Sequence, residues 1–157
     1  MTYNEGIKVM GEYHVVLRDS NGRIKKEETF KNIIPNTGLA ELAALACADV
    51  GGTGWDYIAL GTDDTAAAAA QTALIAEITT LGGARGTGTG TVTTTTTTND
   101  TFQLVKTFSF TGALILKEIG VFNDAAAGEM LSRQVMNFTA ANGDSLQVTY
   151  KIIFARA

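Results

Sequence analysis

The sequence has one cysteine and one histidine among its 157 residues. These are too few for a disulfide framework, and too few for a zinc site built from about four such ligands. No apolar run approaches the ~18 residues of a transmembrane helix, so we expect no contact with a membrane. The first ten residues have neither a basic start nor an apolar stretch, so we expect no signal peptide.

Charge is also scarce. Charged residues make up 18% of the chain, against about 25% in an average globular protein. The formal net charge is −4, so the chain lacks the electrostatic basis for binding nucleic acid. A soluble monomer normally covers itself with charged side chains. Their scarcity indicates a surface that other protein covers, or one that is neutral and rich in threonine.

The length favours one domain, or a core domain with an arm. Residues 1–35 form the predicted arm, a β-hairpin, and residues 36–157 form the predicted core domain. Residues 11–18 alternate as a strand does, and Asp19–Gly22 supplies the turn chemistry of a hairpin. The return strand over residues 23–31 is heavily charged, which is typical of an exposed or edge strand.

The spacing of apolar residues predicts a first helix over about residues 37–48, with Asn36 or Thr37 as its cap. Five residues share its apolar stripe: Leu39, Leu42, Ala43, Ala46 and Cys47. This pattern predicts that Cys47 is a small core residue and not a nucleophile.

A short strand is predicted from Trp55 to Gly61, and its apolar neighbours favour packing of Trp55 in the core. After it, Asp63, Asp64 and Thr65 are good caps for a second helix. We expect that helix over about residues 66–78, through the alanine run.

Residues 82–100 are of low complexity, with Gly-Thr repeats followed by six consecutive threonines. Such repeats cannot fill a core, but the six consecutive threonines have high strand propensity. We expect a flexible loop followed by an exposed strand.

The last third shows strand periodicity most clearly. Strands are predicted around residues 102–110, 113–122, 130–136 and 146–154. In the last of these, five large residues share one face: Leu146, Val148, Tyr150, Ile152 and Phe154. Short strands without strand–helix alternation predict a mainly β fold, an antiparallel β-sandwich or jelly-roll-like domain with one or two short helices and the N-terminal hairpin arm.

Few residues qualify for chemistry. His14 lies in the middle of an exposed strand, which favours a surface polar residue over a catalytic base. Asp63, Asp64 and Glu77 could form an acid–base pair or bind calcium. However, adjacent residues point in different directions and no calcium-loop spacing is present, so helix capping explains them better.

The stretch Gly86–Gly90 superficially resembles a phosphate loop. It lacks the usual glycine spacing, and no capped helix follows it, so a mobile loop is the better interpretation. Arg85 and Arg133 are isolated cations, for which we expect salt bridges. We therefore predict a non-enzyme with no catalytic residue, no cofactor and no metal site.

Three runs carry a resemblance to a known family: YIALGTDDTAAAAAQTALIAEI, KEIGVFNDAAAGEMLSRQVM and NGDSLQVTYKIIF. The chain is similar over about residues 55–155 to a widespread group of small virion structural proteins of tailed bacteriophages. The matching features lie at Tyr57–Thr62, Leu74–Glu77, Glu118–Phe122 with Met130–Val135, and Gly143–Phe154.

The resemblance implies a capsid decoration (cement) protein on the outer shell of a virion, made in the bacterial cytoplasm. Its partners would be the major capsid protein or neighbouring virion proteins, and copies of itself, which we expect to assemble as a trimer. Two alternatives are open. One is a tail, collar or head-fibre adaptor of the same virion, and the other is a carbohydrate-binding β-sandwich.

Ile152→Asp is expected to prevent folding, because it would place an unpaired carboxylate on the covered face of the last strand. Burial of such a side chain contributes roughly 1.5–3 kcal/mol, a large part of a domain's net stability. Thr96→Asp, in the threonine run, is the matched control and should fold. Circular dichroism and thermal unfolding of both variants provide the measurement. A soluble, fully folded Ile152→Asp variant would contradict the strand assignment.

Overall fold

Most of the chain forms β-strands, as the period-two alternation of its apolar residues predicts. In the computed structural model, which describes residues 6–157, nine strands and one helix are present in that range. The strands form two antiparallel sheets. The chain is therefore mainly β, with one short helix, α1 (Asn36–Leu45).

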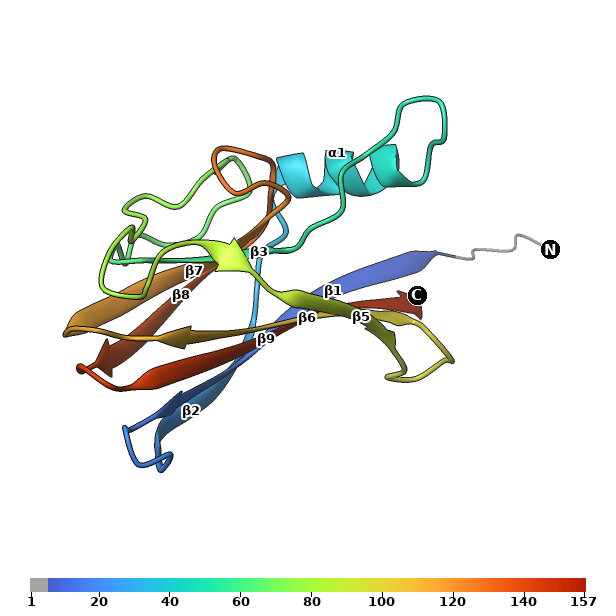
Figure 1. Cartoon of the computed structure of the whole chain (residues 1–157). Coiled ribbons are helices and arrows are strands. Elements are labelled where there is room, and N and C mark those ends of the chain that lie inside the picture. Colours follow the sequence, from blue (N-terminus) through green and yellow to red (C-terminus); the bar gives the residue numbers. More distant parts are fainter. Residues whose placement is uncertain (1–5) are drawn as a thin grey trace.

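The larger sheet has five strands, and the termini of the described chain lie in two of them (Figure 1). In spatial order they are β2 (Ile24–Lys31), β1 (Ile7–Arg18), β9 (Ser145–Arg156), β6 (Thr101–Ser109) and β5 (Thr89–Thr93). The four-stranded sheet has the order β4 (Gly86–Thr87), β3 (Tyr57–Gly61), β7 (Leu114–Phe122) and β8 (Met130–Ala140).

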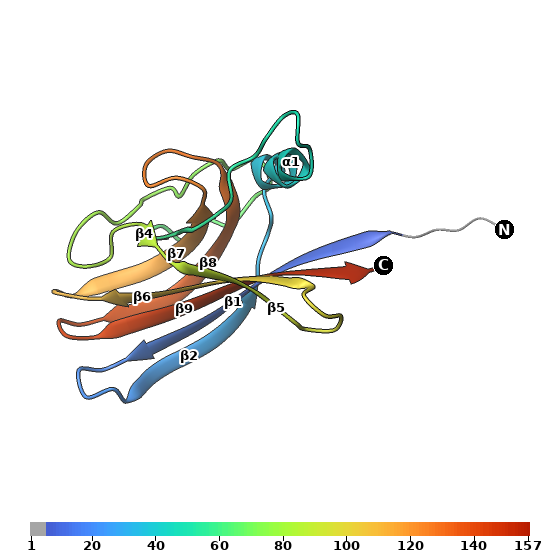
Figure 2. The ribbon, with the colours of Figure 1, turned by 45° about the vertical axis from the view of Figure 1, so that its right-hand side comes forward.

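One hydrophobic core receives side chains from both sheets. Val15 and Val148 reach it from the five-stranded sheet, and Ile119 and Phe138 reach it from the four-stranded sheet. The two sheets therefore bury their apolar faces against each other (Figure 2).

The predicted strands of the last third are confirmed as β6, β7, β8 and β9. On β9, four of the five expected residues are buried: Leu146, Val148, Tyr150 and Ile152. The fifth, Phe154, is 39% exposed. It lies near the end of β9, where that strand projects beyond the four-stranded sheet (Figure 1).

The N-terminal hairpin is present as β1 and β2, but it is not a separate arm. β1 pairs with β9 over its full length, from Ile7 opposite Arg156 to Arg18 opposite Ser145. Tyr13, Val15 and Leu17 point into the shared core. The expected boundary after residue 35 therefore cuts through one sheet. Met1–Glu5, the start of the expected arm, lies outside the described residues.

The first predicted helix is confirmed as α1, but its details differ. Pro35 occupies the N-cap position without a side-chain capping bond, and the Thr37 hydroxyl donates to the Met130 carbonyl at 3.2 Å instead. The helix ends at Leu45, before the end of the apolar stripe. Cys47 lies beyond it and is exposed, so the expectation of a core cysteine is wrong.

The second predicted helix, over residues 66–78, does not form; the segment is irregular and ends in an isolated bridge between Glu77 and Gly61. Helix propensity is a weak preference that tertiary contacts override. Here the backbone N–H groups of Ile75 and Ala76 donate to the buried Glu118 carboxylate, at 3.1 and 2.7 Å. The Ile78 N–H donates to the Leu60 carbonyl at 2.8 Å. These bonds hold the end of the segment beside β3.

The low-complexity region has the reverse of the expected arrangement. The Gly-Thr repeat, expected as a flexible loop, forms β4 and β5 (Thr89–Thr93), and the threonine run, expected as an exposed strand, leaves the sheet after Thr93. The rest of the threonine run turns back toward β6. The Asp100 carboxylate holds this turn, because it accepts the backbone N–H groups of Thr95, Thr96 and Thr97 at 2.7–2.8 Å.

These hydrogen bonds, first of all the one from Thr97, hold the pKa of Asp100 below its usual value. A carboxyl with a lowered folded pKa stabilises the fold above its unfolded pKa of about 3.9, and that stabilisation is lost as pH falls below it. We expect the threonine turn to loosen only in strong acid, below the titration of an ordinary aspartate. Amide chemical shifts of Thr95–Thr97 during an acid titration report this, and Asp100→Asn is the control. A titration midpoint of these amide shifts near pH 3.9, about the value of an ordinary aspartate, would contradict this expectation.

Candidate interaction site: an apolar groove

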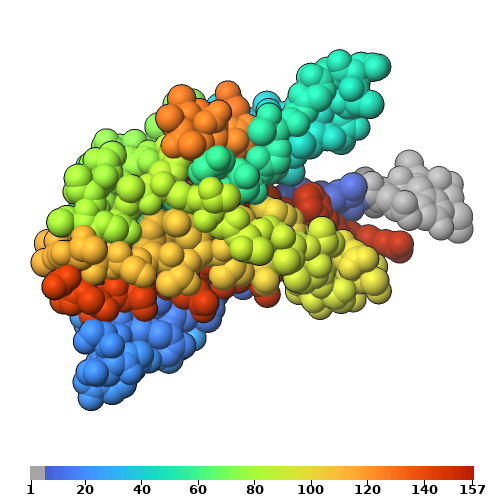
Figure 3. Space-filling model, in the orientation of Figure 1, coloured from blue at the N-terminus to red at the C-terminus, as the bar shows by residue number. Residues whose placement is uncertain are grey.

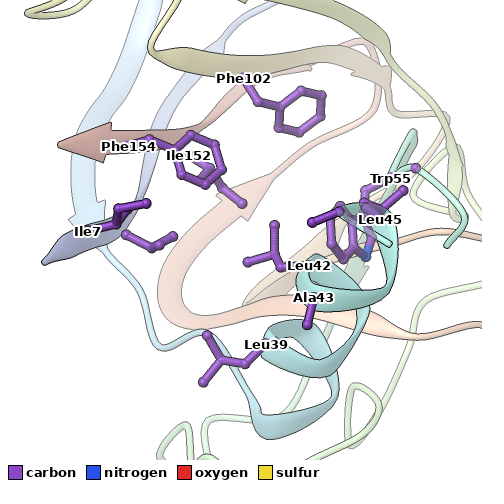
Figure 4. A pocket seen from close by; sticks show the side chains of 12 residues that line it. Ile7, Leu39, Leu42, Ala43, Leu45, Trp55, Phe102, Ile152 and Phe154 are labelled. Atoms are coloured by element: carbon purple, nitrogen blue, oxygen red, sulfur yellow. The ribbon is translucent and has the colours of Figure 1, made fainter. Parts of the chain in front are cut away.

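An apolar groove of about 710 Å³ opens where the five-stranded sheet extends past the four-stranded sheet. One wall is α1, and the other is formed by the projecting ends of β1 and β9 (Figure 3). Figure 4 shows Leu39, Leu42 and Leu45 on the helix wall, with Phe102, Ile152 and Phe154 across from them.

Local sequence explains both walls. On the sheet side, Val9 lies opposite Phe154 and Phe102 lies opposite Ile152 in neighbouring strands. The apolar residues on the inner face of the five-stranded sheet therefore continue beyond the part that the four-stranded sheet covers. On the helix side, α1 touches β8 through Gly38, where an added Cβ would lie 2.9 Å from the Leu131 carbonyl oxygen.

The groove is a surface feature and not a closed core. Ile7 is 79% exposed and Leu39 is 50% exposed, although both are large and apolar. Contiguous exposed apolar side chains typically mark a site of protein interaction. None of the twelve lining residues is titratable. The groove can therefore bind an apolar surface, but it supplies no group for acid–base or nucleophilic chemistry.

Trp55 lines the groove but packs in the core and is only 6% exposed, in agreement with the expectation from sequence. A second hollow, of about 360 Å³, lies next to Lys31 and Asn32, where β2 ends.

The residues singled out from the sequence do not come together. His14 lies on β1 with its Nε2 atom 2.7 Å from the Glu27 carboxylate, and both side chains are partly exposed. Hydrogen bonds from Thr65, first from its side chain and then from its backbone N–H at 2.8 Å, lower the pKa of Asp63. Asp64 lies 3.6 Å from the Lys117 ammonium. Because no helix follows, the expected capping role of Asp63 and Asp64 is wrong.

Arg85 forms the salt bridge that the sequence predicts, and its partner is Glu77 in a two-pronged contact of 2.8 and 2.6 Å. Glu77 is therefore not a capping residue either. The Arg85 guanidinium also lies 3.7 Å from the centre of the Phe122 ring and donates to the carbonyls of Asp124 and Ala127. These contacts fix the turn between β7 and β8.

Gly86–Gly90 belongs to β4, β5 and the residue between them, so the expectation of a mobile loop is wrong. The Gly88 N–H donates to the Asp56 carbonyl at 2.7 Å, which ties the glycine repeat to the start of β3.

Arg133 also forms the expected salt bridge, but the sequence does not show that it is buried. Arg133 is 1% exposed and Glu118 is fully buried, with both Nε and one terminal nitrogen of Arg133 at 2.8 Å from the Glu118 carboxylate. Arg133 donates further to the Thr65 carbonyl and to the Gln71 side chain. The sequence signal is the presence of charge inside two apolar strands: Glu118, next to Lys117, in β7, and Arg133 in β8.

Two tyrosines form a second buried polar group. The hydroxyls of Tyr13 and Ser132 are hydrogen bonded, and the rings of Tyr13 and Tyr150 have centres 4.6 Å apart. Burial raises the pKa of both tyrosines, so both remain protonated over the physiological range.

Over residues 6–157, no group of three or more His, Cys, Asp or Glu side chains is arranged to hold a metal ion. Within the same range no helix has the length and apolar character needed to cross a membrane.

Comparison with known proteins gives no match: no family model, no curated protein and no solved structure is significantly similar to this chain. Statements about its function therefore depend on its residues and its geometry.

Removing one partner of the Arg133–Glu118 pair should destabilise the fold by about 3–5 kcal/mol, because it leaves a buried charge uncompensated. Glu118→Gln tests this, and it also weakens the acceptors for Ile75 and Ala76. Arg133→Met is the second single variant. The double variant should lose less free energy of unfolding than the sum of the losses in the two single variants. Urea unfolding of the three variants measures these differences. Simple additivity would show that the two groups do not act as a pair.

Proposed function

We propose that this chain is a non-enzymatic structural protein of a tailed-phage virion, and specifically a capsid decoration protein that binds the outer shell and stabilises it. The apolar groove carries this proposal. It is a preformed, partly exposed surface whose lining residues can contact protein but cannot perform catalysis. The resemblance over residues 55–155 supplies the class of partner.

The finer fold that we propose is an antiparallel β-sandwich of the jelly-roll kind. The shared core between the two sheets supports it. Such a scaffold leaves strand ends and loops free for contacts, and a decoration protein needs many small contacts of this kind repeated over a shell.

A tail, collar or head-fibre adaptor is the second candidate, because the same groove could hold a different neighbour. A carbohydrate-binding β-sandwich is less well supported. Trp55 is the only tryptophan, and at 6% exposure its ring is not available to stack on a sugar. The trimer expected from the sequence stays a prediction, which sedimentation of the purified protein tests.

Leu39→Asp and Phe154→Asp should weaken binding to DNA-free capsid shells, because each removes an apolar contact and adds a charge in the groove. Burial of one such side chain contributes roughly 1.5–3 kcal/mol, so each variant should bind at least about tenfold more weakly. Co-sedimentation with shells measures the binding. Ile115→Asp is the matched control, since Ile115 is apolar and 56% exposed but lies on β7 outside the groove.

Equal binding by the groove variants and the control would contradict the role of the groove. Binding to purified tails and not to shells would favour the adaptor. Copy number in purified virions, measured by quantitative mass spectrometry, separates the two independently, because a decoration protein is present in hundreds of copies and an adaptor in few.

A further inference from the structure

The edges of the two sheets differ sharply in how they are protected. An edge strand offers unpaired N–H and C=O groups to any extended chain, and proteins usually protect such edges with charge or cover. β2, at one edge of the five-stranded sheet, carries charges on most of its residues (IKKEETFK). At the edge of the four-stranded sheet, β8 is bridged by Ile33 and receives a hydrogen bond from Lys26 to the Asn137 carbonyl.

β5 has none of these protections within the described part of the chain. It lies at the opposite edge of the five-stranded sheet, pairs with β6 alone, and runs without a bulge from Thr89 to Thr93 (Figure 2). No charged residue occurs between Arg85 and Asp100. Four of its five residues are exposed, and Val92 is 64% exposed.

We infer that β5 is a self-association edge, which pairs antiparallel with β5 of a second copy of this chain. Charge supports this occupant. β2 places five charged side chains along its edge, which discourages pairing, whereas two copies of β5 bring no charged side chain together. The contact would join the two five-stranded sheets into one continuous sheet about a two-fold axis.

The sequence of β5, TGTVT, is self-complementary in this arrangement. In the register centred on Thr91, that residue faces Thr91 of the second copy, and Thr89 faces Thr93. Cross-strand threonine pairs are favourable. Gly90 then faces Val92 of the second copy, and it has room for that side chain, because a Cβ built on Gly90 meets only the Phe102 ring, at 3.6 Å.

The two-fold contact also orients the apolar grooves. Val92 lies beside Phe102, which lines the groove. An axis perpendicular to the sheet keeps the inner faces of both copies on the same side, so both grooves lie on the same face of the joined sheet. A five-residue pairing is small compared with a standard interface of about 1,600 Å². Self-association should therefore depend on protein concentration and increase on a lattice, where copies are held close together.

Disulfide trapping tests the register directly. In a Cys47→Ser background, T91C places the two new thiols opposite each other, and oxidised glutathione supplies the oxidant. The matched control is T107C, an exposed threonine on the neighbouring strand β6. We expect T91C to form covalent dimers at least about tenfold faster than T107C. T89C alone should be slow, while the T89C/T93C double variant should cross-link.

T91K provides a second readout, because it places two lysines opposite each other and should abolish concentration-dependent dimers in sedimentation. Equal trapping of T91C and T107C would overturn the inference, as would self-association that T91K leaves unchanged, including a trimer. Either result would leave the shell-binding experiment on the groove unaffected, so this contact and the proposed function fail separately.

Discussion

The pairing of β9 with both β1 and β6 is the constraint on which the other features depend. β9 bonds to β1 over twelve positions and to β6 over nine. The first and last strands of the chain therefore form the middle of the larger sheet, and this sheet cannot form before the C-terminal strand is available. The same pairing extends β1 and β9 past the smaller sheet, which creates one wall of the groove. It also leaves β2 and β5 as the two edges.

A buried polar pair has the corresponding role in the smaller sheet. Glu118 and Arg133 lie on neighbouring strands, and the irregular segment that follows β3 supplies further hydrogen-bond partners to both. Buried charges are tolerated when they are paired and hydrogen bonded. Here the backbone of that segment provides the additional partners, so the pair orders a stretch of chain that forms no regular structure.

Sequence alternation predicted strands such as β1 and β9 well because each of them buries one face along most of its length. It could not predict which strand pairs with which, so the hairpin of β1 and β2 was expected to be separate, although Tyr13, Val15 and Leu17 already indicated a buried face. The alanine run favoured a helix locally, and the distant Glu118 carboxylate overrides that preference. The groove was not predictable, because Leu39 and Phe154 have the pattern of core residues. They are exposed only because one sheet is longer than the other.

The central claim is that this chain is an assembly component that acts through its surfaces. A reconstruction of the intact virion by electron cryomicroscopy tests this most directly. The account predicts density for the chain on the outer shell, with the apolar groove facing the capsid protein. A virion in which the chain is absent from shell and tail alike would contradict the account.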